Sequence, residues 1–207
     1  WPESLDVLAH VERDGFGGRP FGLWARGPLR LNEVLARSVS VVGSRAASAY
    51  GEFVATELGA GLAERGACVV SGAAYGIDAA AHRGALAVGG RTVAVLACGV
   101  DVPYPRGNAQ LLSLIAAEGL IVSEVPLGST PTRPRFLVRN RVIAAATPGT
   151  VLVEAAPRSG ALNTAGWVHL CHHLLMGVPG TVTSSLSAGV HDDLRRGAAV
   201  VTDPSEA

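Results

Sequence analysis

The stretch Val39-Ser40-Val41-Val42-Gly43-Ser44-Arg45 is a short, mostly apolar run that ends in a glycine-containing turn. Residues 48–65 follow with helical periodicity, because apolar side chains recur at i, i+4 and i+8 from Val54. Ser48 suits the N-cap of this helix, and Gly66 suits its C-terminal end. A strand, a turn and a helix in this order form the repeating unit of a parallel sheet.

The same alternation continues along the chain. Strands are predicted where the sequence is almost continuously apolar, as in a sheet covered on both faces, at residues 39–42, 68–70, 92–97, 120–123, 150–153, 174–178 and 198–201. Helices are predicted at residues 48–65, 78–88, 108–117, 139–146, 162–173 and 191–196. The sequence therefore predicts an α/β, doubly wound fold whose mostly parallel sheet has about seven strands or more, flanked by helices.

The first 38 residues have a different character from the rest. They contain Gly- and Pro-rich connections around one predicted edge strand at residues 21–25. We expect residues 1–38 to be a lead-in that packs on the sheet and residues 39–207 to form the main domain. Residues 126–134, with three prolines, predict a long ordered loop or a lid. Because Trp1 opens the chain instead of Met, we also expect a fragment of a longer protein.

Composition excludes several classes of protein. With 207 residues and 48% hydrophobic residues, the chain can bury a core without disulfides, and its three cysteines do not suit a disulfide framework. No apolar run approaches the roughly 18 residues of a membrane span, and no secretion signal opens the chain. We therefore expect a cytoplasmic protein with no membrane partner.

Positive charge is concentrated in one segment, although the chain as a whole is neutral, with 17 basic and 17 acidic residues. All the basic residues are arginines, and four of them lie in residues 133–141. No acidic residue occurs between Glu124 and Glu154. A GC-rich codon bias would explain the missing lysines, but it would not explain the clustering.

Three predicted turns at one sheet edge suit phosphate groups. Each turn combines glycine with hydroxyl groups at the start of a helix, where orphan N–H donors favour anions. The alternative is that these glycines only permit the turns. The candidate phosphate-binding residues are Gly43, Ser44, Arg45, Ser71, Gly72, Ser159 and Gly160.

Two common nucleotide-binding motifs are absent from the sequence. No G-x-G-x-x-G follows the first predicted strand, and no carboxylate ends the second, so NAD is disfavoured. A P-loop needs lysine, which the chain lacks. We expect no cofactor.

The run Phe136-Leu137-Val138-Arg139-Asn140-Arg141 is the most distinctive feature. The predicted helix start at residue 139 puts Arg139 and Arg141 in the first turn, where the helix dipole disfavours cations and a bound anion would favour them. Asn140 adds an amide, and Phe136 offers a stacking face for a base. In the alternative, these arginines pair with Glu124 and Glu154, and Phe136 is buried.

The motifs along residues 39–203 resemble those of the DNA-processing protein A family, also called DprA or Smf. They include Gly43-Ser44-Arg45, Ser71-Gly72-x-Ala74-x-Gly76-Ile77-Asp78, Ser123-Glu124-x-Pro126, Phe136-x-x-Arg139-Asn140-Arg141, Val153-Glu154-Ala155 and Ser159-Gly160-Ala161-Leu162. The resemblance implies a Rossmann-like domain that binds and protects single-stranded DNA without hydrolysing it. It also implies loading of the recombinase RecA onto that strand in natural transformation, DNA uptake and DNA recombination.

The chain departs from the family pattern at two places. Cys171-His172 stands where the family usually has Gly-Arg, which puts one phosphate contact in doubt. Asp193 stands where an apolar residue is usual.

Two other functions use the same fold. A nucleoside-monophosphate phosphoribohydrolase needs a catalytic glutamate on the helix after the late Gly-rich turn, but residues 161–173 contain no carboxylate, so we expect no enzyme. A mononucleotide sensor would use the same turns without the arginine cluster. His169 and His173 have a spacing that can bind zinc, but no further ligand lies near them in the sequence, so no metal is expected.

The end of the chain suggests self-association. A short helix at residues 191–196 precedes the predicted terminal strand, and an edge strand has unpaired backbone groups. The family resemblance implies a homodimer at this place, and we expect His191, Leu194 and Val200 to form the contact. Asp193 would be repelled by its symmetry mate unless Arg195 or Arg196 of the other chain reached it.

Overall fold

A mostly parallel sheet forms the centre of the computed structural model, which describes residues 1–13 and 15–207. Within these residues the main sheet has eight strands in the order β10-β9-β8-β4-β5-β6-β7-β3, and only β3 runs antiparallel to its neighbour. The strands are β3 (Trp24–Arg26), β4 (Ser38–Val42), β5 (Cys68–Ser71), β6 (Thr92–Leu96), β7 (Leu120–Ser123), β8 (Gly149–Leu152), β9 (Leu174–Gly177) and β10 (Ala199–Val200). The strands β1 (Glu12–Arg13) and β2 (Phe16–Gly17) pair antiparallel in a separate two-stranded sheet.

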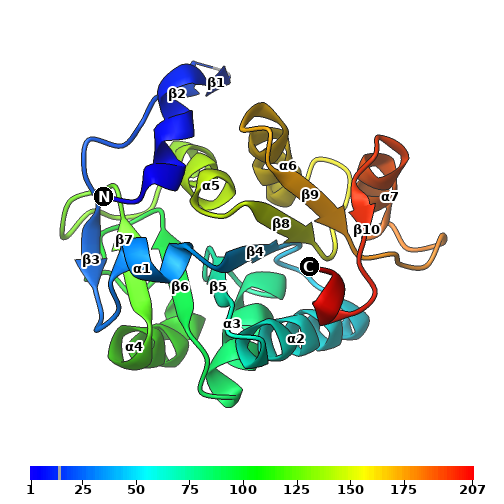
Figure 1. The fold of residues 1–207 in the computed structure, drawn as a ribbon, viewed down its shortest axis with the longest axis horizontal. Helices are drawn as coiled ribbons and strands as arrows, with labels where there is room; N and C mark the ends of the chain where they lie inside the picture. The colour runs from blue at the N-terminus through cyan, green and yellow to red at the C-terminus, as the bar shows by residue number, and fades with distance from the viewer. Residues whose placement is uncertain (14) are drawn as a thin grey trace.

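Helices cover both faces of the sheet (Figure 1). One layer contains α5 (Arg133–Ala146), α6 (Gly160–Leu170) and α7 (Ala188–Arg195), with the 3-10 helix η1 (Glu3–His10) packed on α5. The other contains α2 (Ala49–Glu64), α3 (Ile77–Ala87) and α4 (Ala109–Glu118). The remaining elements are α1 (Leu31–Leu35), η2 (Arg106–Asn108) and η3 (Pro204–Glu206).

Burial on both faces explains why the strands read as continuous apolar runs. Along β4, Val42 packs with the core under α5 and α6, while Val39 and Val41 pack with the core under α2 and α3. The predicted α/β, doubly wound fold and all seven predicted strands are confirmed, and the predicted edge strand is β3. Ser48 is the N-cap of α2, and its Oγ accepts a hydrogen bond from the Gly51 N–H at 3.0 Å.

The start of α5 was predicted six residues too late. Helix α5 begins at Arg133, with Pro134 in its first turn, where the fixed φ of proline and its missing N–H fit a helix. The last residues of the predicted loop 126–134 are therefore helical. Arg139 and Arg141 lie beyond the first turn, so the helix-dipole argument for a bound anion beside them is wrong.

Strand order creates a crevice between β4 and β8. From β4 the chain passes through α2 to β5 on one side, and later returns from β7 through α5 to β8 on the other side. Ligands of open α/β sheets bind where the connections diverge in this way, at the carboxyl ends of the strands. No helix in the described part of the chain is long and apolar enough to cross a membrane.

Candidate functional site

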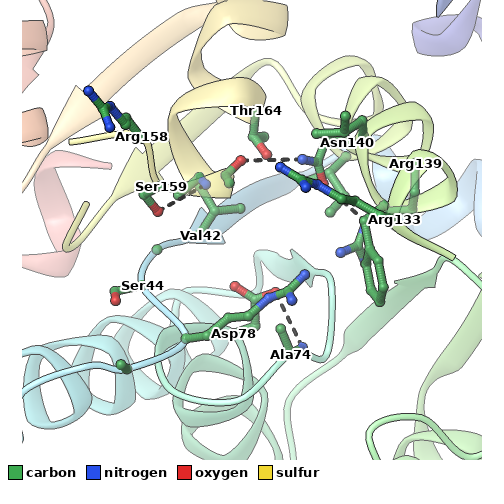
Figure 2. Close-up of a pocket in the computed structure, with 18 of the residues that line it drawn as sticks. Val42, Ser44, Ala74, Asp78, Arg133, Arg139, Asn140, Arg158, Ser159 and Thr164 are labelled. Carbon is green, nitrogen blue, oxygen red and sulfur yellow. Dashed lines mark hydrogen bonds between the residues drawn. The ribbon is translucent and has the colours of Figure 1, made fainter. Parts of the chain in front are cut away.

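A cleft of about 730 Å³ opens at the carboxyl ends of β4 and β8, between α5 and the N-terminus of α6 (Figure 2). The turn after β4 forms one wall, and residues 156–160 form another. Most of the side chains predicted from the sequence line this one cleft: Gly43, Ser44, Arg45, Phe136, Arg139, Asn140, Ser159 and Gly160. The cleft is therefore the candidate site.

The N-terminus of α6 faces the cleft with no carboxylate in its first turn. The Ser159 Oγ caps the helix by accepting a hydrogen bond from the Ala161 N–H at 3.2 Å. The Asn140 Nδ2 steadies the turn from α5, donating to the Gly160 carbonyl oxygen at 3.3 Å and to the Asn163 Oδ1 at 3.1 Å. The positive end of the α6 dipole thus remains available to an anion.

The N-terminus of α2 is already occupied by a carboxylate of the chain itself. Glu154 is buried, and its carboxylate accepts hydrogen bonds from the Ser48 N–H at 2.9 Å and from the Ser48 Oγ at 2.5 Å. Its backbone carbonyl also accepts from the Ser44 N–H at 2.7 Å, which ties the turn after β4 to the end of β8. The alternative pairing of Glu154 with the arginine cluster is therefore wrong.

The first turn of α3 likewise contains a carboxylate. The Asp78 Oδ2 accepts a hydrogen bond from the Ala74 N–H at 3.3 Å, and the side chain lines the cleft while it is almost fully buried. Burial raises the pKa of Asp78, and the charges of Arg139 and Arg45 oppose that rise. Of the three turns that the sequence proposed for phosphate, the α6 turn alone lacks an internal carboxylate.

Arg139 lines the cleft, and its buried guanidinium also donates hydrogen bonds to backbone at the ends of two strands. Its Nη1 donates to the carbonyl oxygens of Gly72, at 2.8 Å, and of Val95, and its Nε donates to the Asn140 Oδ1 at 3.2 Å. Burial lowers the pKa of Arg139 to about 10, so the guanidinium keeps its charge at neutral pH. It supplies positive potential to the cleft from a fixed position.

An aromatic and guanidinium stack stands beside Arg139. The Arg45 guanidinium lies over the Phe136 ring, 4.6 Å from its centroid, and the Tyr104 ring centroid is 5.7 Å from that of Phe136. The face of Phe136 that was expected to receive a base is thus covered by Arg45. Bases also stack on guanidinium planes, so the Arg45 plane continues the platform.

Three of the predicted binding residues lie outside the main cleft. Ser71 is fully buried, and its Oγ donates to the Val41 carbonyl oxygen at 2.6 Å. Gly72 lines a smaller neighbouring pocket, where the Arg139 guanidinium fills the space of a Cβ. Arg141 is buried and pairs with Glu124 at 2.7 Å, as in the alternative interpretation. The prediction that Ser71 and Arg141 face a ligand is corrected, because their polar atoms point into the protein interior.

Sequence reasoning did not select several residues that line the cleft. Arg133 was missed because the helix was started too late, and Pro134 was the signal for the earlier start. Arg158, an exposed residue with a positive φ of 68°, and Thr164, one turn into α6, also line the cleft. The cleft therefore presents three exposed arginines: Arg45, Arg133 and Arg158.

The histidines and cysteines have internal contacts. The His173 Nδ1 lies 3.0 Å from the Ala144 carbonyl oxygen, and the His169 Nε2 lies 3.8 Å from the Asp193 Oδ1. No group of three or more possible metal ligands occurs within the described ranges 1–13 and 15–207. Cys68, Cys98 and Cys171 are buried free thiols, and burial raises the pKa of Cys68 to about 12.

The residues expected at a dimer contact lie on α7 and on the edge strand β10. Val200 is exposed, Leu194 packs partly against the core, and the His191 Nε2 lies 3.1 Å from the Gly180 carbonyl oxygen. Asp193 is buried, with the Arg196 Nη1 of the same chain 3.7 Å away. The expected repulsion between Asp193 and its symmetry mate is wrong, because this carboxylate faces inward.

Comparison with known proteins shows which protein family this chain matches. The family model described as "DNA recombination-mediator protein A" matches residues 2–207. A putative DNA processing protein DprA of Mycobacterium tuberculosis is 54% identical over 209 residues, which cover 98% of this chain and 53% of the relative. Protein Smf of Escherichia coli is 39% identical, covering 90% of this chain and 50% of the relative. The chain thus spans about half the length of these relatives.

Solved structures agree with the family match. DNA processing protein A of Streptococcus pneumoniae superposes with a TM-score of 0.89 at 35% identity, covering all of this chain and 69% of that one. DNA processing protein A of Helicobacter pylori, described for its single-stranded DNA binding mode, superposes with a TM-score of 0.87 at 27% identity. The match covers all of this chain and 90% of that one. A molybdenum cofactor binding protein from Rippkaea orientalis gives 0.56 at 16% identity, which shows the fold alone.

Proposed function

This chain belongs to the DNA recombination-mediator protein A family, and from that membership and the cleft geometry we propose that it binds single-stranded DNA across the carboxyl edge of its sheet. One observation carries the proposal. Exposed Arg45, Arg133 and Arg158 line the same cleft as the open N-terminus of α6, and cations with orphan N–H donors are the groups that bind phosphate.

The cleft favours an unpaired strand over a duplex. Its stack of Arg45 on Phe136 lies beside the arginines, so it offers a platform to bases that are not enclosed in a double helix. Gly43 and Gly160 bring backbone to the surface of the same cleft, where a strand can approach closely.

Replacing Arg45 with Ala is expected to weaken single-strand binding by about 1–3 kcal/mol, because the change removes both a phosphate partner and the outer plane of the stack. The slope of log affinity against log salt should become shallower by roughly 0.7 for the lost phosphate contact. Fluorescence anisotropy with labelled single-stranded and duplex oligonucleotides over a salt series measures both effects.

Arg26→Ala is the matched control for Arg45→Ala, because Arg26 is an exposed arginine on β3, outside the cleft lining. Its affinity and salt slope should equal those of the wild type. Equal wild-type affinity for duplex and single strand, or an Arg45→Ala salt slope identical to that of the wild type, contradicts the proposal.

We further propose that the bound strand is protected and then passed to RecA in natural transformation, DNA uptake and recombination. The family description as a recombination mediator supports this step. We propose binding without turnover, because α6 carries no carboxylate and the carboxylate of Glu154 is engaged by Ser48. Release of a base from nucleoside monophosphates would instead favour the phosphoribohydrolase alternative.

We also propose a homodimer through α7 and β10, supported by the exposed Val200 on the open edge of the sheet. Light scattering over a protein concentration series should give a mass near twice 21.1 kDa. Val200→Asp should shift that mass toward the monomer, because it places a charge at the centre of the contact. Val182→Asp, a change at another exposed valine, serves as the control. A monomer at every concentration excludes this interface.

A further inference from the structure

A second, apolar pocket of about 220 Å³ lies beside the cleft, between the ends of β6 and β7 and helix α5. Its lining is mostly aliphatic, with Val95, Leu96, Val125, Val138 and Val142 among the residues. Its volume corresponds to that of about seven liquid waters, enough for a heterocyclic ring but small for a whole nucleotide. None of the groups proposed to bind phosphate in the cleft lines this pocket.

The pocket lies next to the cleft and shares a lining residue with it. Arg139 lines both, and Leu96 and Ala97 also line the small pocket under the Arg45 and Phe136 stack. The first turn of α5 forms the partition, because Arg133 lines the cleft and Arg135 lines the apolar pocket. A strand that leaves the cleft on this side therefore has to cross the N-terminus of α5.

The N-terminus of α5 suits a phosphate at that crossing. Its first turn has no acidic residue, and it carries the exposed Arg133 and the half-buried Arg135. The helix dipole adds a positive end to these two cations. A backbone phosphate placed there leaves its base beside the mouth of the apolar pocket.

One carboxylate contributes to the lining of the pocket, and a buried arginine holds it in place. The Glu124 Oε1 accepts a hydrogen bond from the Arg141 Nη2 at 2.7 Å, and the Glu124 side chain is 31% exposed. The Arg141 Nε and Nη1 are buried without a hydrogen-bond partner among the described residues. Such an incompletely satisfied buried ion pair adds little stability, but it fixes the position of the Glu124 carboxylate.

We propose that this pocket is a nucleobase subsite: where the strand crosses the N-terminus of α5, one base turns into the pocket, and Glu124 accepts a hydrogen bond from its exocyclic amino group. The aliphatic walls contact the faces of the ring. Cytosine, adenine and guanine carry an exocyclic amino group and thymine does not, so the subsite discriminates against thymine. This inference rests on the proposed single-strand binding.

The test compares three oligonucleotides of equal length by fluorescence anisotropy: oligo-dC, oligo-dT and an abasic deoxyribose-phosphate strand. The wild-type protein should bind oligo-dC about tenfold more tightly than oligo-dT, the effect of one hydrogen bond to a charged acceptor. It should bind the abasic strand more weakly than either. Equal affinity for oligo-dC and oligo-dT would contradict the subsite while leaving phosphate binding intact, whereas no binding to any strand would contradict the proposed function itself.

Two variants separate the carboxylate from the apolar walls. In Glu124→Gln, the amide oxygen keeps the bond from Arg141 and the amide N–H₂ replaces the acceptor, so the preference for oligo-dC should disappear or reverse. Val138→Phe fills the pocket, so the preference for oligo-dC should disappear with an unchanged salt slope, while stacking on the Arg45 plane keeps the affinity for both strands above the abasic level. Leu114→Phe, at an exposed leucine on α4, is the matched control.

Thermal unfolding checks that each variant is folded, so that binding changes can be assigned to the subsite. A preference for oligo-dC that persists in both folded variants would overturn the proposal. If the pocket instead receives a side chain of a protein partner, neither variant will change the ranking of the three strands, and the proposal is again overturned.

Discussion

Replacing Arg139 with Ala is expected to lower the free energy of unfolding by about 3–5 kcal/mol, the range for removing one partner of a buried charged network. The change removes the Arg139 donor from the Gly72 and Val95 carbonyl oxygens and removes one of the two cations, Arg139 and Arg45, that act on the buried Asp78. It also opens a cavity where the guanidinium fills space above Gly72. Urea denaturation followed by circular dichroism measures the effect.

Arg133→Ala is the matched control for this prediction. Arg133 lies on the same helix but is exposed, so its loss should change stability by no more than about 0.5 kcal/mol. An Arg139→Ala protein as stable as the wild type would mean that Arg139 serves only the ligand. The expected loss would show instead that weak strand binding by this variant cannot be read as one lost phosphate contact.

Acidification from about pH 7 to pH 5 is expected to lower stability by about 2 kcal/mol through His82 alone. His82 is fully buried, with its Nδ1 2.7 Å from the Thr92 Oγ1, and burial lowers its pKa from 6.5 to about 3. Below about pH 6.5, His82 therefore becomes protonated in the unfolded chain. In the folded chain it stays neutral until the pH falls to about 3. The contribution of His82 to stability is fully present above the pKa of His82 in the unfolded chain, and it is lost progressively as the pH falls below that value.

Denaturation at several pH values compares the wild type with His82→Gln, which keeps a hydrogen-bonding group for Thr92. The variant should lack the His82 contribution to the slope between about pH 7 and pH 5. Asp78 acts in the opposite direction in acid, because its pKa is raised by burial, and it is present in both proteins. Parallel slopes for the two proteins would exclude His82 as the group responsible.

The positions of the strands, and the edge of the sheet that holds the candidate site, follow from local sequence patterns. Each buried strand must be apolar on both faces, so β4 through β9 could be located from residue type alone. The carboxyl ends of parallel strands meet at one edge, so residues that follow different strands, such as Arg45 and Ser159, could be assigned to one site. For this reason most of the candidate site could be predicted without a structure.

The start of α5 was also encoded locally, but its signal was overlooked. Pro134 permits a helix start at Arg133, and that start determines which arginines reach the cleft. Because of this error, the buried Arg141 was predicted as a binding residue, and Arg133, which is exposed in the cleft, was not. The earlier start adds Arg133 to the helix and moves Arg139 and Arg141 from its first turn into its interior.

The sequence by itself thus determined the fold class, the strands and the edge of the sheet where ligands bind, because these depend on periodicity and on the geometry of parallel strands. Only the tertiary structure decided the partner of each charge. Glu154 meets Ser48, and Glu124 meets Arg141. These choices depend on strand order and on the rotation of α5, which place groups far apart in the chain within hydrogen-bond distance, and no local pattern records that distance.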